Sequence, residues 1–188
     1  FYFSISLAAL FFYALQYATE SAWSVVIKRF LEAMFGYMPY GAAVIVIVLL
    51  AGHLDLHHLY HWMDSTLYHE FMTIDGGVTT YADKEVAGAV VNPNYDHIMA
   101  GKKGYFSVWF FWLRTIIYLT TFLGFAMLFR KWSLEEDKEP NLDLHYKVFR
   151  RSAMFLVFFA VFSSTLSWDW LMSIDPHWFS TLYGWYLF

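Results

Sequence analysis

Long apolar runs separated by short polar clusters dominate the chain. Roughly 20 apolar residues are needed to cross the hydrocarbon core of a bilayer as a helix. Runs of this length cover residues 1 to about 22, 33–54 and 104–129, and a fourth begins at Ser152. A fifth begins at Trp178 and is truncated at residue 188. The pattern predicts an all-α integral membrane protein with four full spans and the start of a fifth.

The last part of the sequence shows how two of these spans are joined. Its apolar run passes a hydroxyl cluster and reaches one carboxylate, Asp169, which lies between two tryptophans. Six residues later Asp175 precedes Pro176, and the residue before a proline is disfavoured in helical geometry. We therefore expect residues 1–172 to form a transmembrane four-helix bundle, and residues 173–188 to form a turn and the start of a further transmembrane helix.

Two polar segments lie between the spans: an extramembrane loop at about residues 59–103 and a connector at 130–151. Within the connector, the acidic run 135–137 is expected to be solvated. One side of the bundle holds eight basic residues and the other three, so the positive-inside rule predicts a cytoplasmic connector and a periplasmic loop. The eight are Lys28, Arg29, Arg130, Lys131, Lys138, Lys147, Arg150 and Arg151, and the three are Lys84, Lys102 and Lys103.

The composition agrees with a membrane protein and excludes several functions for this segment. Hydrophobic residues make up 59% of the chain and charged residues 15%, whereas soluble domains carry about 25% charge. The net charge of −4 and the lack of a basic stripe argue against a nucleic-acid partner. The chain has no cysteine, which excludes disulfides, cysteine-ligated iron–sulfur clusters and c-type haem attachment here.

Three ionisable residues are predicted to lie at membrane depth: Glu20, Arg114 and Asp169. Helical spacing places Tyr118 beside Arg114, and Thr165 beside Asp169. In the first span, polar residues recur every four positions, at Gln16, Glu20 and Ser24, which would place them on one helix face. Charges in hydrocarbon are costly and often mark proton or ion routes. Two interpretations remain open: a structural Arg114–Asp169 ion pair that holds two helices together, or a proton path through all five residues.

A histidine cluster follows the second span. His53, His57 and His61 recur every four residues, which would place them on one helix face and raises the possibility of a zinc or iron site. Only one such cluster exists, so we expect no metal. The cluster instead predicts an interfacial helix that contacts a partner protein through His57, His58 and His61, together with Asp175 and His177 of the turn.

Three segments of the chain resemble one known family. They are YATESAWSVVIKR at 17–29, which extends through Glu32 to Met34, residues 105–118, and WLMSIDPHWFS at 170–180. These segments resemble the F subunit of bacterial alternative complex III, also described as quinol:cytochrome c oxidoreductase, quinone-binding subunit 2. That family is related to the membrane subunits of polysulfide-reductase type. The turn within residues 170–180 is the most specific part of the resemblance.

The resemblance implies a multi-pass subunit of the bacterial inner membrane, about twice the length of this chain and built from two helix bundles. It implies a complex that oxidises menaquinol and passes electrons to a cytochrome or a terminal oxidase. The expected partners are a homologous quinol-binding membrane subunit, an iron–sulfur subunit and c-haem subunits. The F subunit itself would hold no cofactor or metal, would not be catalytic, and would support assembly and proton translocation.

Two other functions are compatible with parts of the pattern. A membrane di-iron hydroxylase or desaturase uses histidine boxes, but it needs several of them on different segments. A secondary transporter uses broken helices at matched positions in two halves, and only the turn at Asp175-Pro176 suggests a break.

Overall fold

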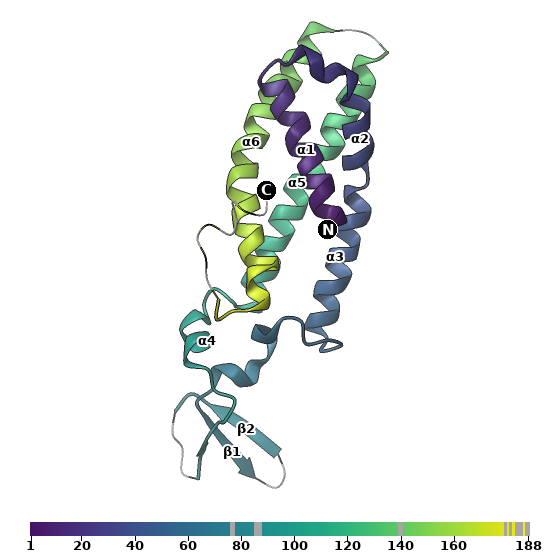
Figure 1. Cartoon of the computed structure of the whole chain (residues 1–188). Coiled ribbons are helices and arrows are strands. Elements are labelled where there is room, and N and C mark those ends of the chain that lie inside the picture. Colours follow the sequence, from purple (N-terminus) through teal and green to yellow (C-terminus); the bar gives the residue numbers. More distant parts are fainter. Residues whose placement is uncertain are drawn as a thin grey trace.

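The computed structural model describes residues 1–75, 78–84, 88–138 and 141–178, together with 180, 182 and 186. Most of the described chain is helical (Figure 1). The helices of the bundle are α1 (Tyr2–Ala18), α2 (Lys28–Gly36), α3 (Met38–His53), α5 (Val108–Glu136) and α6 (Leu142–Trp170). Helices α2 and α3 follow one another along one side of the bundle, where both contact α1 and α5 (Figure 1).

Three helical stretches of the described chain are long and apolar enough to cross a membrane: Lys28–His53, Val108–Glu136 and Leu142–Ile174. The prediction of a helical membrane protein is therefore supported in this coarser form. The span predicted at residues 1–22 is instead the 17-residue helix α1. At 1.5 Å per residue, the described part of α1 is about 26 Å long.

Local sequence explains where the helices begin and end. Helix α3 starts with Met38-Pro39, and proline is tolerated in a first helical turn because those N–H groups have no intrahelical acceptor. Helix α6 starts after Asn141, whose side chain accepts a hydrogen bond from the Asp143 N–H at 2.8 Å. It ends at Trp170, and a 3-10 turn at Met172–Ile174 leads to an extended Asp175. The helix thus ends two residues before residue 172, where the bundle was predicted to end.

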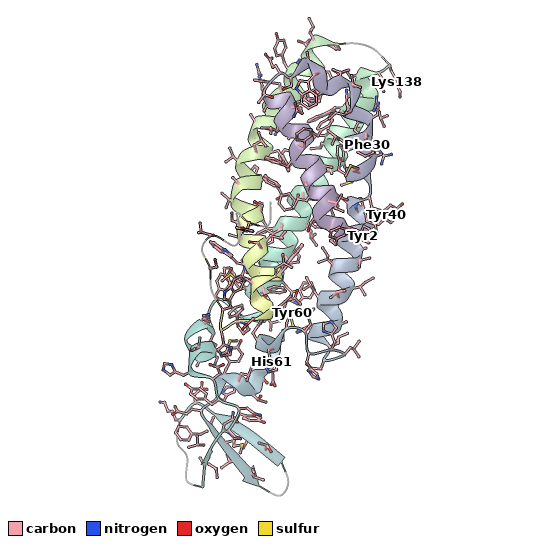
Figure 2. The ribbon with its side chains drawn as sticks, in the orientation of Figure 1. Tyr2, Phe30, Tyr40, Tyr60, His61 and Lys138 are labelled. Carbon is pink, nitrogen blue, oxygen red and sulfur yellow. The ribbon has the colours of Figure 1, made fainter. Side chains whose placement is uncertain are left out.

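Aromatic rings fill the middle of the bundle. Phe122 and Phe129 of α5 and Phe155 of α6 are fully buried, and Phe11 of α1 stacks on Phe159 with ring centroids 4.5 Å apart. By contrast, several large apolar side chains project from the outer surface of the bundle (Figure 2), among them Tyr2, Phe30 and Tyr40. A buried aromatic centre with an apolar exterior fits a helix bundle surrounded by lipid.

The extramembrane segment is more ordered than the expected loop. It holds 3-10 turns at His61–Met63 and Ser65–Tyr68, the strands β1 (Phe71–Asp75), β2 (Val78–Ala82) and β3 (Val90–Val91), and the short helix α4 (His97–Lys102). The strands form an antiparallel sheet in the order β2-β1-β3. In its register Phe71 faces both Ala82 and Val91. The all-α prediction therefore missed a small sheet beyond one end of the bundle (Figure 1).

The expected fifth span falls largely outside the described residues. From Trp178 onward only residues 178, 180, 182 and 186 are described.

Candidate functional site

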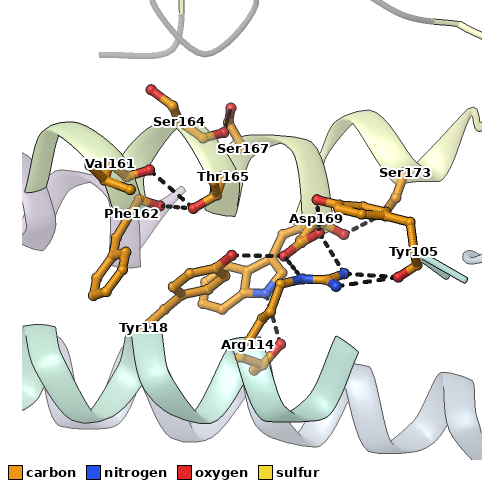
Figure 3. A network of polar contacts seen from close by, with 12 residues as sticks. Tyr105, Arg114, Tyr118, Val161, Phe162, Ser164, Thr165, Ser167, Asp169 and Ser173 are labelled. Atoms are coloured by element: carbon orange, nitrogen blue, oxygen red, sulfur yellow. Dashed lines mark hydrogen bonds and ion pairs between the residues drawn. The ribbon is translucent and has the colours of Figure 1, made fainter. Parts of the chain in front are cut away.

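Arg114 of α5 and Asp169 of α6 form a bidentate ion pair (Figure 3). The guanidinium Nε donates to Oδ2 at 2.7 Å and one terminal nitrogen donates to Oδ1 at 2.9 Å. The Asp169 side chain is 0% exposed and the Arg114 side chain 12%. Parallel N–H···O bonds of this kind are among the strongest hydrogen bonds in proteins. The pair predicted from the sequence is therefore present, and it joins two candidate spans.

Two tyrosine hydroxyls complete the surroundings of the carboxylate. Tyr105 donates to Oδ1 at 2.7 Å and Tyr118 donates to Oδ2 at 3.0 Å. Each carboxylate oxygen thus accepts one bond from Arg114 and one from a tyrosine. All four contacts stabilise the carboxylate as an anion. Burial, followed by the neighbouring Asp169 carboxylate, raises the pKa of Tyr105, which keeps this hydroxyl a donor at neutral pH.

The remaining surface of Arg114 is also occupied. Both terminal nitrogens lie 3.3 Å from the backbone oxygen of Tyr105. The guanidinium carbon lies 4.1 Å from the ring centroid of Tyr105 and 4.3 Å from that of Phe110, a cation–π geometry. Aromatic faces therefore take the place of water around the cation.

Neighbouring residues fix the position of Asp169. The Trp170 indole N–H donates to the Thr115 hydroxyl at 3.3 Å, and the Tyr60 hydroxyl donates to the Trp170 backbone oxygen at 2.9 Å. The Ser173 hydroxyl donates to the Asp169 backbone oxygen. These contacts hold the end of α6 against α5 and against the segment that follows α3. Tyr60, Tyr105 and Ser173 were missed as neighbours of the site because all three come from outside the regular helices.

Thr165 lies one turn from Asp169, as the spacing predicts, but its hydroxyl points back to its own helix. It donates to the backbone oxygens of Val161 and Phe162 at 3.0 and 3.3 Å (Figure 3). Threonine hydroxyls in helices often make this bond to the preceding turn. Among the described contacts Thr165 is therefore a neighbour of the site rather than a ligand of the carboxylate.

Glu20 does not join this site. The predicted stripe of Gln16, Glu20 and Ser24 is wrong because α1 ends at Ala18 and Glu20 adopts a positive φ of 51°. Glu20 is exposed beyond the end of α1, whereas Phe3 at the start of α1 contacts Trp170 with ring centroids 5.7 Å apart. The length of α1, about 26 Å, separates Glu20 from the Arg114–Asp169 end of the bundle.

A second polar cluster, which we call the Glu136 cluster, occupies the other end of the bundle. Glu136 Oε2 accepts bonds from Lys28 Nζ at 2.6 Å and from the Tyr17 hydroxyl at 3.1 Å. Its Oε1 lies 3.8 Å from His145 Nδ1. The acidic run 135–137 was expected to be solvated, but Glu136 is the last residue of α5 and its side chain is only 22% exposed.

Glu32 lies in the same part of the bundle. It is buried, and its carboxylate accepts bonds from Ser133 of α5 and from Arg29 one turn earlier. Arg29 also pairs with Asp137. The sequence carried one signal for this contact, since Arg29 and Glu32 lie one helical turn apart.

Between the two polar sites lies the aromatic centre formed by Phe122, Phe129, Phe155 and Phe159. No hydrogen bond described for the chain links the Glu136 cluster to the Arg114–Asp169 pair across this layer. The structure therefore places two polar sites at opposite ends of the bundle.

The histidine cluster does not form one helix face. Helix α3 ends at His53, and Asp55 turns the chain with a positive φ of 55°. His57 then folds back onto α3: its Nδ1 accepts from the Leu59 N–H at 3.3 Å and its Nε2 lies 3.0 Å from the Val48 oxygen. Because Nδ1 accepts a hydrogen bond, the proton is on Nε2, which donates to the Val48 oxygen. The His57 ring therefore packs against the last turns of α3. His58 and His61 are exposed.

The turn residues contact the extramembrane segment. His177 Nε2 lies 2.5 Å from Asp96 Oδ2, and the Asp175 side chain accepts from the His177 N–H at 3.2 Å. Lys102 Nζ donates to the Pro176 oxygen at 2.6 Å. The His177 ring thus has an intramolecular partner while its side chain is 54% exposed, and its predicted contact with a partner protein stays a prediction. No three His, Asp or Glu side chains within the described ranges come together as a metal site.

Neither protein-family models nor curated protein sequences gave a match to the chain.

Proposed function

We propose that the chain is a membrane subunit, without a redox centre of its own, of a quinol-oxidising respiratory complex of the alternative complex III type. The observation that most directly supports this proposal is the buried Arg114–Asp169 ion pair between two candidate spans. Burying two charges at this depth is costly, and such residues commonly serve ion or proton movement. In this proposal the pair supports proton translocation by the complex and helps to hold the subunit together.

Proton translocation through this subunit would use the two polar sites in series. The Glu136 cluster lies at the end predicted to be cytoplasmic and the Arg114–Asp169 pair at the end predicted to be periplasmic. The aromatic layer between them would require water or a neighbouring subunit to complete the path. Such a neighbour fits the proposed partners: a homologous quinol-binding membrane subunit, an iron–sulfur subunit, c-haem subunits and a terminal oxidase. The proposed location is the bacterial inner membrane.

Copurification tests the proposal most simply. The full-length protein, tagged and extracted from its native membrane in mild detergent, should elute as a large assembly. That assembly should show c-haem absorption and iron–sulfur electron paramagnetic resonance, and it should oxidise menaquinol. Elution as a monodisperse monomer without haem or clusters would contradict the proposal.

A further inference from the structure

An open, basic cavity lies along the first turns of α6, at the same end of the bundle as the Glu136 cluster. Its volume is about 340 Å³, and small-molecule sites typically measure about 300–1,000 Å³. The cavity is lined by Asp143, Tyr146, Lys147, Arg150 and Arg151. Three cations thus share the cavity with a single carboxylate, which favours an anionic ligand.

The three cations are not neutralised within the described part of the chain. Lys147, Arg150 and Arg151 are all exposed, and none of them forms an ion pair with an acid of the described residues. By contrast, Lys28 and Arg29 at the same end of the bundle both pair with carboxylates. The cavity therefore keeps its positive charge available for a ligand from outside the chain.

The cavity lies at the depth where α6 enters its apolar run. No charged side chain occurs between Arg151 and Asp169, so the two arginines mark the boundary between lipid headgroups and hydrocarbon. Lys147 Nζ lies 4.7 Å from the ring centroid of Trp132, which follows the apolar run of α5. Both helices therefore cross this boundary at the same level.

An apolar surface continues from the cavity toward the middle of the bundle. Arg151 Nη1 donates to the Met154 sulfur at 3.5 Å, so the cavity and this surface adjoin. From Arg150 onward, apolar side chains follow at helical spacing on one face. They are Met154, Val157 and Val161, which are 42%, 68% and 56% exposed. A molecule with an anionic head and a long apolar chain matches the cavity and this surface together.

We infer that the cavity binds the phosphodiester headgroup of an anionic phospholipid. Arg150 and Arg151 donate to the phosphate oxygens, Lys147 adds a third positive charge, and an acyl chain lies along Met154 and Val157. Guanidinium groups match the geometry of phosphate oxygens, and basic pockets at the cytoplasmic ends of spans are typical sites for anionic headgroups. The cavity and the Arg114–Asp169 pair lie at opposite ends of the bundle, so lipid binding and the proposed function can fail independently.

Lipid binding to the full-length protein, purified from its native membrane, tests the inference. Radiolabelled phosphatidylglycerol or phosphatidylcholine is titrated in mixed detergent micelles, and the lipid retained by the protein is counted. Phosphatidylglycerol should bind saturably. Phosphatidylcholine, whose quaternary ammonium balances the phosphate charge, should bind at least tenfold more weakly. Glycerol phosphate, which has the headgroup but no chains, should not displace phosphatidylglycerol at tenfold excess. Equal binding of the two lipids, or displacement by glycerol phosphate, would overturn the inference.

Two double variants locate the site. Arg150→Gln/Arg151→Gln should weaken phosphatidylglycerol binding at least fivefold. The matched control, Arg130→Gln/Lys131→Gln, removes two exposed cations at the end of the apolar run of α5, outside the cavity, and should leave binding unchanged. Equal losses in the two variants would attribute binding to the general surface charge. Unchanged lipid binding in the first variant, with loss of a copurifying protein, would assign the cluster to an acidic partner protein. Either result would contradict a lipid site in the cavity.

Discussion

Thr115 and Trp170 are hydrogen-bonded at 3.3 Å, one residue beyond each member of the Arg114–Asp169 pair. Two consecutive residues of α5 thus bind two consecutive residues of α6, which fixes both the rotation and the vertical register of the helices. The Arg114–Asp169 ion pair and the Trp170–Thr115 hydrogen bond are thus adjacent contacts between the same two spans.

Trp170→Phe removes the indole donor but keeps an aromatic ring. We expect a loss of about 1–2 kcal/mol in stability, from one hydrogen bond and part of the packing. Trp168→Phe, on the same helix but 37% exposed, should change stability by less than about 0.5 kcal/mol. Melting of the purified full-length protein in detergent measures both. Equal effects of the two variants would show that the hydrogen bond between Trp170 and Thr115 does not contribute to stability.

The two ends of the bundle are expected to lie on opposite sides of the membrane. Lys84 follows strand β2 of the extramembrane segment. Lys138 lies at the opposite end of the molecule from the sheet (Figure 2). Because the basic residues concentrate at the Lys138 end, the positive-inside rule predicts that this end is cytoplasmic. Lys84→Cys should react with a membrane-impermeant maleimide in spheroplasts, and Lys138→Cys only in inverted vesicles. The reverse pattern would invert the orientation.

Gly52 makes room for the His57 ring. A Cβ at Gly52 would lie 2.9 Å from Cε1 of His57, whereas a Cβ at Gly124 of α5 would meet nothing within 4 Å. Gly52→Ala should therefore displace His57 from the Val48 oxygen and cost about 1 kcal/mol, the net value of one hydrogen bond. Gly124→Ala should instead be neutral or stabilise by up to about 1 kcal/mol, since alanine is the better helix former. If Gly52→Ala melts above wild type, the His57 contact is not needed.

Asp96 gives the extramembrane segment a defined acid sensitivity. Burial opposes ionisation, but hydrogen bonds from the Met99 and Ile98 N–H groups and the His177 contact prevail and lower the pKa of Asp96. A lowered folded-state pKa stabilises the fold above the ordinary value of 3.8, and this stabilisation is lost as the pH falls through the folded-state value. Hydrogen-exchange protection of α4 should thus fall as the pH drops below 3.8.

Asp96→Asn is the matched control, because asparagine still caps a helix but does not titrate. It should reduce the difference in α4 protection between pH 5 and low pH. An unchanged acid transition in this variant would assign the effect to another group.

The Arg114–Asp169 pair could be predicted from sequence because a charge inside an apolar run has few alternatives to pairing. Its tyrosine partners could not all be found this way: Tyr118 shares the α5 face with Arg114, but Tyr105 precedes the helix and folds back. The Glu136 cluster was missed for a related reason. Its acid lies at a helix end that resembles a solvated loop in sequence, and only packing of α1 and α2 shows that it is enclosed.

The sheet and the histidine segment show the limits of periodicity. The runs at 71–75 and 78–82 are rich in β-prone residues and are separated by two residues, which is a hairpin signal, but scattered charge around them favoured a loop. The spacing of His53, His57 and His61 suits a helix. The helix nevertheless ends at His53, because the turn at Asp55 allows His57 to bind back onto α3.

In the proposed function, the buried Arg114–Asp169 pair serves proton translocation as well as stability. Removing one partner leaves the other as an unpaired buried charge, which costs roughly 3–5 kcal/mol. Asp169→Asn and Arg114→Gln alone should therefore impair assembly, as measured by copurification. The double variant Arg114→Gln/Asp169→Asn removes both charges but retains hydrogen-bonding groups, so it should assemble.

The decisive measurement is proton translocation by this double variant in proteoliposomes, followed with an internal pH-sensitive dye during quinol oxidation. We predict an assembled complex that oxidises quinol but moves no protons across the membrane. Translocation at the wild-type proton-to-electron ratio would contradict the account and leave the Arg114–Asp169 pair with a structural role alone.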